Sequence, residues 1–273
     1  MRSVRLDIPQ TAAQPGEVRG AARALLLLAM FGALASCAAD GHRAQRDALR
    51  RIVQSQCLPA YRRQLDPAPC ARLVVPVPGG VADGYAVLKD RKAGAHFLLI
   101  PTRTLAGIES PELLDRRTPN YFAAAWRARD VLDRWTGRSL PRDAVGLAIN
   151  PQVARGQDQL HIHMECVGGM LYRTLADQAA GLGPAWSPLN IAGRRFEARQ
   201  VLGEDLDGKS PFRLLAEGLP GARRRLGAYT LIVAGHGFAA GPGFVVLAAT
   251  GAPGGETLLD ARCAVSDPAA AQR

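Results

Sequence analysis

The stretch QLHIHMEC, residues 159–166, alternates strictly between apolar and polar side chains. A period of two is typical of a β-strand that buries one face in the core. His161 and His163 then lie next to each other on the opposite face, together with Gln159 and Glu165. Two neighbouring imidazoles on a strand indicate a reactive site, and we expect that site on this face. The apolar face would consist of Leu160, Ile162, Met164 and Cys166.

The segments before this strand predict an antiparallel α+β layer. Residues 84–90 and 96–101 read as two strands joined by a turn at 91–94, which predicts a β-hairpin. Residues 144–150 predict a third strand, and a polar loop, 151–158, leads into the histidine strand.

Helices are expected on either side of that hairpin. Residues 43–57 predict a helix, followed by a proline-rich loop to about residue 80. Thr118-Pro119 predicts the start of a second helix, because a capping residue precedes a proline. That helix would run to Thr136 and stop at Gly137, with Trp126 and Trp135 facing inward.

The second half of the chain repeats the expected order of elements. Residues 195–202 predict a strand, 210–226 a helix interrupted near Pro220, and 229–234 and 244–248 two further strands. One interpretation is an internal duplication whose second copy has lost its histidines, and the other is a single enlarged sheet. We expect a catalytic half at 43–170, a second half at 171–266 and a disordered tail at 267–273.

The N-terminal residues 1–37 resemble a targeting segment. Residues 21–35 are apolar apart from Arg23, and fifteen residues are short for a membrane span, which needs about 20. They suit the apolar core of a secretory signal. The following residues 34–37, LASC, resemble a bacterial lipobox in which Cys37 is lipidated. The alternative is an uncleaved anchor helix, and either would tether the folded part outside the cytoplasm.

Four further cysteines agree with export, since an even number in an exported chain suggests disulfides. Three pairings are open. We favour Cys57 with Cys70, which closes a short loop, and Cys166 with Cys263, because Cys166 lies on the core face and needs a partner from inside.

The composition of the chain argues against a nucleic-acid partner. The chain has 273 residues and a formal charge of +10, but only three of its 34 basic residues are lysines. An arginine, alanine, glycine and proline bias of this kind suits a GC-rich genome. No basic tract with interleaved aromatic residues is present, so we expect no nucleic-acid partner.

Paired strand histidines suit a metal site, a solvated structural face or nucleophilic catalysis. Zinc needs three or four protein ligands, and apart from Glu165 no third ligand lies at a sequence spacing that is typical of a zinc site. We therefore expect no metal and no cofactor, and we expect His96 to be structural. A neutral imidazole can attack phosphorus and form a phosphoramidate that water opens. Asn150, Arg155 and Gln157 would hold the phosphates from the adjacent strand end and loop.

The motif QLHIH, residues 159–163, resembles the histidine-triad motif of nucleotide hydrolases and transferases. The segments GYAVLKD, HFLLIPTRTLAGIESPELL, TPNYFAAAWRARDVL, LAIN and SPFRLLAEGLPGAR, with the four cysteines, resemble the CDP-diacylglycerol pyrophosphatase family. The resemblance covers roughly residues 45–265. It implies a histidine-triad-like antiparallel sheet and an enzyme at the periplasmic face of the bacterial inner membrane.

The resemblance also implies the reaction, the hydrolysis of membrane-held CDP-diacylglycerol to CMP and phosphatidate. His161 would be the nucleophile that forms a CMP–histidine intermediate, and His163 would contact the phosphoryl oxygens. The other expected site residues are phosphate-binding Asn150, Arg155, Gln157, Gln159 and Lys89, and ribose-binding Asp90.

Gln159 departs from the family pattern, since it occupies the place of the first triad histidine. Its amide can donate and accept hydrogen bonds but cannot take a proton at neutral pH. The alternative functions are a hydrolase of soluble nucleoside diphosphate conjugates and a lipoprotein that binds nucleotides or phospholipids without turnover. Histidine-triad proteins are commonly dimers, so the chain would be a homodimer, or a monomer if the duplication supplies both halves.

Overall fold

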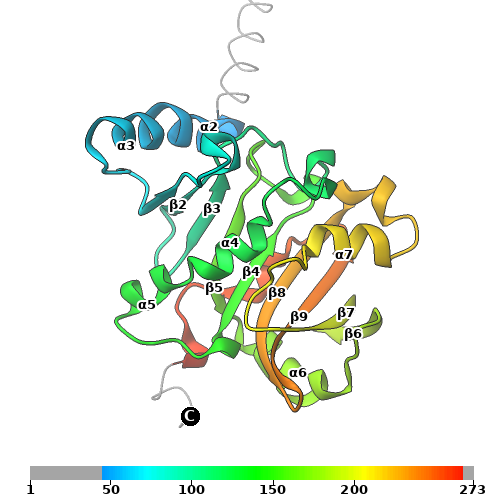
Figure 1. The fold of residues 1–273 in the computed structure, drawn as a ribbon. Helices are drawn as coiled ribbons and strands as arrows, with labels where there is room; N and C mark the ends of the chain where they lie inside the picture. The colour runs from blue at the N-terminus through cyan, green and yellow to red at the C-terminus, as the bar shows by residue number, and fades with distance from the viewer. Residues whose placement is uncertain (1–44, 267–273) are drawn as a thin grey trace, which may run out of the picture. The chain divides into compact units, whose positions relative to one another are not determined.

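The computed structural model describes residues 45–266, and a 10-stranded antiparallel sheet runs through them (Figure 1). Its strands follow the order β1-β2-β3-β5-β4-β8-β9-β7-β6, and β10 pairs separately with β5. The α+β prediction is therefore confirmed. The strands are β1 Arg72–Val74, β2 Tyr85–Lys89, β3 Phe97–Pro101, β4 Val145–Ile149, β5 Ile162–Val167, β6 Ser187–Ile191, β7 Arg194–Leu202, β8 Tyr229–Phe238, β9 Gly241–Thr250 and β10 Leu259–Asp260.

The strand order is mirrored about the β4–β8 pair in the middle of the sheet. Moving outward from β4 gives β5, β3 and β2, and moving outward from β8 gives β9, β7 and β6. Along the chain, each side is a hairpin, then helix, then a second strand pair. An internal duplication would produce this arrangement, and common ancestry of the two halves stays a prediction.

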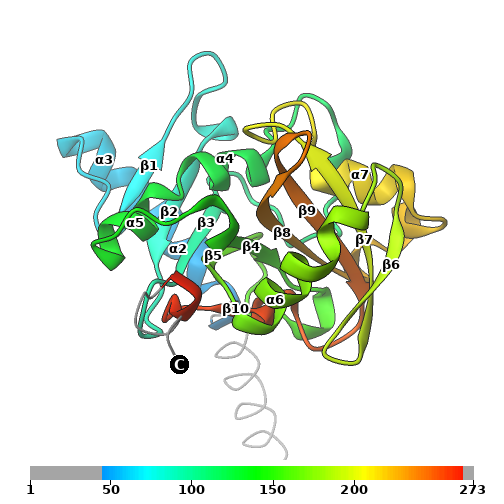
Figure 2. The ribbon, with the colours of Figure 1, turned by 90° about the horizontal axis from the view of Figure 1, so that it is seen from below.

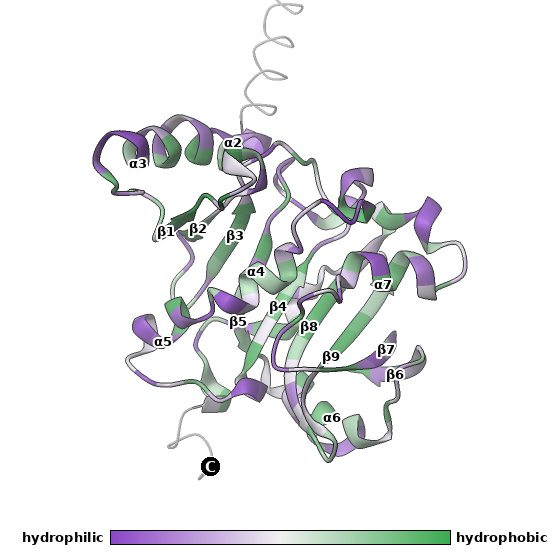
Figure 3. Cartoon of the chain, viewed as in Figure 1, coloured by the Kyte–Doolittle hydropathy of each residue, from purple (hydrophilic) through white to green (hydrophobic). Residues whose placement is uncertain are grey.

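Helices cover both faces of the sheet (Figures 1 and 2). One face packs against α4 Tyr121–Arg127, α5 Asp130–Thr136 and α7 Pro211–Gly218 in the largest core cluster. On the opposite face, α2 Ala48–Ile52 and α3 Leu58–Gln64 cover β2 and β3, and α6 Gly169–Gln178 covers the β7–β9 region. The central strands are hydrophobic, whereas polar residues gather on α3 and α5 (Figure 3).

The helix expected at 118–136 differs in three details. Asn120, not Thr118, caps it, and the Asn120 side chain accepts a hydrogen bond from the Ala123 N–H at 3.3 Å. The helix breaks between α4 and α5. Trp135 is 54% exposed instead of facing inward, because the break changes which side of α5 meets the core. Gly137 ends α5 in the left-handed region, as predicted.

Other boundaries also differ from the sequence-based expectations. Helical structure continues past residue 57, through a π-helical turn at Val53–Cys57 and then α3, to Gln64, with Pro59 in the first turn of α3. The helix α7 ends at Gly218, before Pro220. Strand β5 begins at Ile162, three residues later than expected. Strands β1, β6 and β10 and helix α6 were not predicted.

Both favoured disulfide pairings are confirmed, Cys57 with Cys70 and Cys166 with Cys263. The expected signal, the lipobox Cys37 and the tail 267–273 lie outside the described residues. Within residues 45–266, no helix is long and apolar enough to cross a membrane.

The C-terminal segment, residues 251–263, crosses the sheet over β4 and β5. Strand β10 pairs with the end of β5, and the Cys166–Cys263 disulfide fastens the same place. The segment packs closely on the end of β4, since a Cβ on Gly254 would lie 2.1 Å from Asn150 Oδ1. The segment covers the histidine face, so β5 is buried on both sides and not on one.

Candidate active site

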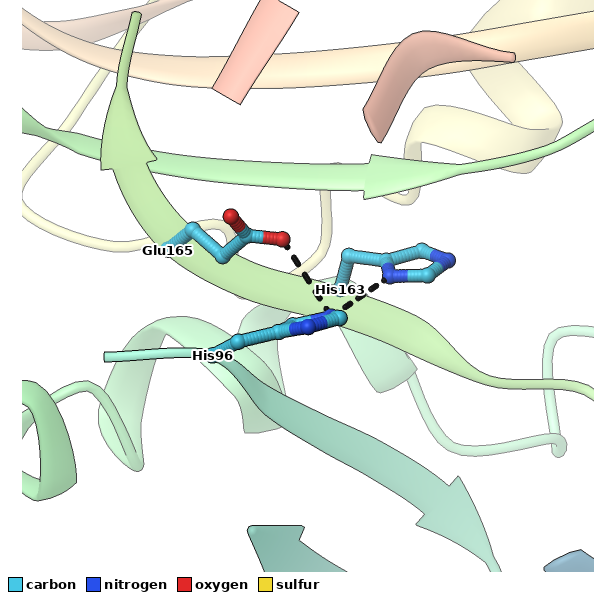
Figure 4. A group of neighbouring side chains, drawn as sticks. All are labelled: His96, His163 and Glu165. Atoms are coloured by element: carbon cyan, nitrogen blue, oxygen red, sulfur yellow. Dashed lines mark hydrogen bonds and ion pairs between the residues drawn. The ribbon is translucent and has the colours of Figure 1, made fainter. Parts of the chain in front are cut away.

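Four side chains meet on the covered face of β5. His163 and Glu165 project from that strand and His161 immediately precedes it; His161, His163 and Glu165 are 8%, 4% and 6% exposed. His96 immediately precedes β3, the neighbour of β5, and it is 1% exposed. Figure 4 shows His96 directed toward both His163 and Glu165. The ring centroids lie 5.2 Å apart for His96 and His163 and 5.0 Å apart for His161 and His163.

One hydrogen bond fixes the proton of His161. Its Nδ1 lies 2.8 Å from the main-chain oxygen of Gln159. A carbonyl oxygen only accepts, so Nδ1 carries the hydrogen and Nε2 keeps its lone pair in the neutral ring. Burial lowers the pKa of His161 below its ordinary value, although the bond to Gln159 opposes the shift. His161 therefore presents an uncharged Nε2 with a free lone pair.

His163 contacts groups on both sides of its ring. Its Nδ1 lies 3.0 Å from His96 Nε2 and 3.1 Å from Glu256 Oε2, and its Nε2 lies 3.4 Å from Asn150 Nδ2. Burial holds the pKa of His163 well below its ordinary value, and the neighbouring His161 and His96 lower it further. A second neutral imidazole thus stands beside the first.

His96 joins the site through strand pairing, although 65 residues separate it from His161. Its Nδ1 lies 3.4 Å from Asp90 Oδ2, and its Nε2 lies 3.2 Å from Glu165 Oε1. Burial lowers the pKa of His96, while Asp90 opposes the shift. Burial, followed by the charge of Glu256, raises the pKa of Glu165 to about 7. The sequence signal for His96 is its place at the start of a strand of the predicted hairpin.

The structure brings two of the expected phosphate-binding residues close to the histidines. Asn150 is buried beside His163, and its Oδ1 accepts a hydrogen bond from the Glu256 N–H at 3.4 Å. Arg155 is also buried, and its charge lowers the pKa of His161. Its guanidinium is already held by Glu109 at 2.5 Å and by Asp158 at 3.2 Å.

Two other expected residues are engaged elsewhere. The Gln157 side-chain oxygen accepts from the Leu49 N–H at 3.1 Å, which ties the loop to α2. Lys89 contacts Phe97, which belongs to the core on the opposite face from the histidines, and its Nζ lies 4.8 Å from the Trp135 ring centroid. The structure therefore does not bring Lys89 to the histidine cluster.

The side chain of Gln159 contacts the main chain of the neighbouring segment and not the histidine side chains. Its side-chain amide donates to the carbonyl oxygens of Pro101 at 3.1 Å and Arg103 at 2.9 Å. Its side-chain oxygen is buried and has no hydrogen-bond partner among the described residues. These contacts hold the main chain of Gln159 where its carbonyl meets His161. Asp90, expected at the ribose, faces His96.

The cluster also contains ligand atoms of the kind that bind metals. One donor atom each from His96, His163 and Glu165 lies within 4.8 Å of the other two. No spacing in the sequence joins His96 to the motif, so this grouping was missed.

Two cavities lie away from the imidazole rings. The larger, about 930 Å³, is lined by residues of the second half that include Trp186, Arg199 and Tyr229. The smaller, about 530 Å³, is lined by Met170, Phe196 and residues 257–260, which directly follow Glu256. The smaller cavity is thus adjacent in the chain to the segment that covers the histidines, and the larger one is not.

Known proteins similar to this chain share one description. The family model described as CDP-diacylglycerol pyrophosphatase matches residues 44–267. A relative from Yersinia pestis named CDP-diacylglycerol pyrophosphatase is 40% identical over 189 residues, which cover 68% of this chain and 71% of the relative.

Proposed function

The chain belongs to the CDP-diacylglycerol pyrophosphatase family and is a hydrolase of CDP-diacylglycerol, and we propose that it works through a covalent intermediate on His161. The observation that carries this proposal is the 2.8 Å hydrogen bond between His161 Nδ1 and the Gln159 oxygen. It fixes the tautomer in which Nε2 is the nucleophile, and it turns that nitrogen away from the strand backbone.

In the first step, the Nε2 lone pair attacks the phosphorus that is bonded to cytidine. The bond from this phosphorus to the bridging oxygen breaks, and its electron pair leaves with phosphatidate. The His161 ring becomes positively charged while its Nδ1–H stays bonded to Gln159, so the carbonyl stabilises the charge as it forms.

In the second step, water attacks the same phosphorus from the side opposite the nitrogen. The nitrogen–phosphorus bond breaks and returns its electron pair to Nε2. CMP leaves, and the attacking water loses one proton to the solvent. The same hydrogen bond thus serves both steps, because the ring alternates between its neutral and charged forms without moving.

We assign His163 and Asn150 to the phosphoryl oxygens, because they lie 3.4 Å apart beside His161, on β5 and directly after the neighbouring strand β4. Arg155 is paired with two carboxylates, so we assign it to positioning the 151–158 loop near the nucleophile. Gln159 acts through its main-chain oxygen. Asp90 stays a candidate for the ribose through its place at the end of β2.

The substrate needs an apolar surface near the reacting phosphates for its glycerol and acyl groups. The 530 Å³ cavity offers apolar side chains from Met170, Ile191 and Phe196 beside residues 257–260. We assign this cavity to the lipid half of the substrate.

We further propose that the enzyme is tethered to the periplasmic face of the inner membrane through a lipidated Cys37 or an uncleaved anchor. Two disulfides support an oxidising compartment. Tethering suits a substrate whose acyl chains remain in the bilayer. The mirrored sheet supports an internal duplication and a monomer that contains both halves.

The test uses CDP-diacylglycerol labelled at the cytidine-linked phosphate. Acid-labile label retained on wild-type protein and absent from His161→Ala supports the covalent mechanism. His236→Ala is the matched control, because His236 lies on β8 outside the cluster, and it should retain label. CMP release from His161→Ala at the wild-type rate would overturn the assignment. Activity toward soluble CDP conjugates but not the lipid would overturn the assignment of the lipid cavity.

A further inference from the structure

Four ligand atoms form a continuous chain of close contacts beside His161. Glu165 Oε1 lies 3.2 Å from His96 Nε2, which lies 3.0 Å from His163 Nδ1, which lies 3.1 Å from Glu256 Oε2. All four side chains are shielded, with only Glu256 more than a tenth exposed. Three contacts therefore connect four atoms that are all able to accept hydrogen bonds.

Hydrogen bonds alone cannot account for all three of these close contacts. An imidazole nitrogen has one in-plane orbital, which either carries a hydrogen or accepts one. His96 Nε2 has two neighbours, and so does His163 Nδ1. Each nitrogen can serve one neighbour, so at least one close contact lacks a proper hydrogen bond in every protonation state with neutral rings. One cation between the atoms would use each nitrogen lone pair once and would contact all four groups.

The spacing fits such a cation. Zinc lies about 2.0–2.2 Å from histidine nitrogen and carboxylate oxygen, and a tetrahedron of those bonds separates its ligand atoms by roughly 3.3 Å. The observed separations of 3.0–3.2 Å between successive atoms are close to that value. One donor atom each from His96, His163 and Glu165 already lies within 4.8 Å of the other two, and Glu256, which contacts His163, would turn inward as the fourth ligand.

The surroundings fit as well. A metal-binding histidine usually donates its other ring N–H to a carboxylate, and His96 Nδ1 lies 3.4 Å from Asp90 Oδ2. Two glutamates supply a double negative charge for a divalent ion. The competing cation is Lys92, whose Nζ lies 3.6 Å from Glu256 Oε2 on the solvent side. Lys92 is largely exposed and reaches only this end of the chain of atoms.

We propose that His96, His163, Glu165 and Glu256 bind one divalent transition-metal ion, best fitted by Zn²⁺, at a site adjacent to the nucleophile His161. With the ion on Nδ1 of His163, that ring's hydrogen lies on Nε2, and the Asn150 amide would turn so that its Oδ1, and not its Nδ2, accepts that hydrogen. It would hold the ring of His163 rigidly against the phosphoryl group. The site goes beyond the hydrolysis mechanism, which needs no metal in either step.

The experiment uses the full-length, untagged protein in detergent, stripped with a chelator, dialysed and titrated with Zn²⁺ and with Co²⁺. Metal per chain, competition against a chromophoric chelator and the visible absorption of tetrahedral Co²⁺ are the three readouts. The variants are His96→Gln and Glu165→Gln. Their matched controls are His236→Gln and Glu197→Gln, which change the same residue types on β8 and β7.

We expect one Zn²⁺ per wild-type chain, and the same in both controls. Loss of a ligand should weaken Zn²⁺ binding by about 100-fold or more, because changes to second-shell groups alone cost roughly 10–100-fold. The isosteric Glu165→Gln keeps the inference testable if His96→Gln fails to fold, as monitored by circular dichroism. A wild-type chain that retains no ion would overturn the proposal, and so would binding that survives unchanged in a folded Glu165→Gln variant. Neither result depends on the label-trapping test of His161.

Discussion

Removing each disulfide in turn should show how the length of the loop that a disulfide closes affects the stability of the protein. The Cys166–Cys263 bridge closes a loop of 97 residues, and the Cys57–Cys70 bridge closes one of 13. All four cysteines are buried, so replacing a pair by alanine removes similar contacts in both cases. The difference between the two double variants therefore reports mainly on the unfolded chain.

The loop-closure relation gives the magnitudes. A 97-residue loop corresponds to about 4.7 kcal/mol of stabilisation at 25 °C, and a 13-residue loop to about 2.9 kcal/mol. We expect Cys166→Ala/Cys263→Ala to lower the free energy of unfolding by about 1.8 kcal/mol more than Cys57→Ala/Cys70→Ala does. A loss near 4.7 kcal/mol is a large part of the ~5–15 kcal/mol typical of a folded domain.

Urea unfolding of the detergent-solubilised protein, followed by tryptophan fluorescence and extrapolated to water, measures both losses. CMP release, measured alongside, should fall more for the long-loop variant, because that bridge fastens the segment carrying Glu256 over the histidines. Equal losses for the two pairs, or a larger loss for the short loop, would refute the reasoning from chain entropy.

Three further perturbations have expected directions. Arg46, hydrogen-bonded to Asp158, holds the pKa of that carboxyl at about 2, below the ordinary value near 3.9. The stabilisation that the ionised Asp158 gives the folded state is full above about pH 5 and disappears as the pH falls toward 2. The difference in melting temperature between wild type and Asp158→Asn should therefore close over that range. Asn120→Ala removes an N-cap and should cost about 1–2 kcal/mol in urea unfolding. Gly254→Ala places a Cβ against Asn150 and should cost about 1–3 kcal/mol and slow CMP release.

Controls for these changes are available in the chain. Asp66→Asn is the matched control for Asp158→Asn, because it changes a carboxylate that accepts a local N–H from Ala68. Thr118→Ala tests the cap that the sequence suggested, and a loss equal to that of Asn120→Ala would contradict the observed capping. Gly183→Ala adds a methyl group in open space, so it should leave stability within about 0.5 kcal/mol.

Local patterns predicted those parts of the fold that depend on neighbours in sequence. Alternation and a turn predicted the hairpin that became β2 and β3, and Gly137 predicted the end of α5. Elements without such signals were missed, among them β6 and α6. Strand β6 contains Pro188, which is unusual within strands, and α6 begins at Gly169 directly after Gly168.

Only the part of the site that belongs to a single stretch of sequence was predicted. His161 and His163 follow from the motif, whereas His96 and Glu256 reach them through β3 and the C-terminal segment. No periodicity within residues 251–263 predicts that this segment covers β5. Lys89 was expected beside the phosphates but lies over Phe97 and Trp135, because the sequence alone did not indicate which face of β2 its side chain is on.

The crossing of residues 251–263 over β5 also sets an order in time. Ribosomes release the N-terminal part of a chain first, so β5 and its histidines emerge about a hundred residues before Cys263 can reach Cys166. Until then the histidine face lacks Glu256 and its cover. A nascent chain in transit thus has no completed site, and the enzyme matures only when its last residues have been made and the bridge has closed.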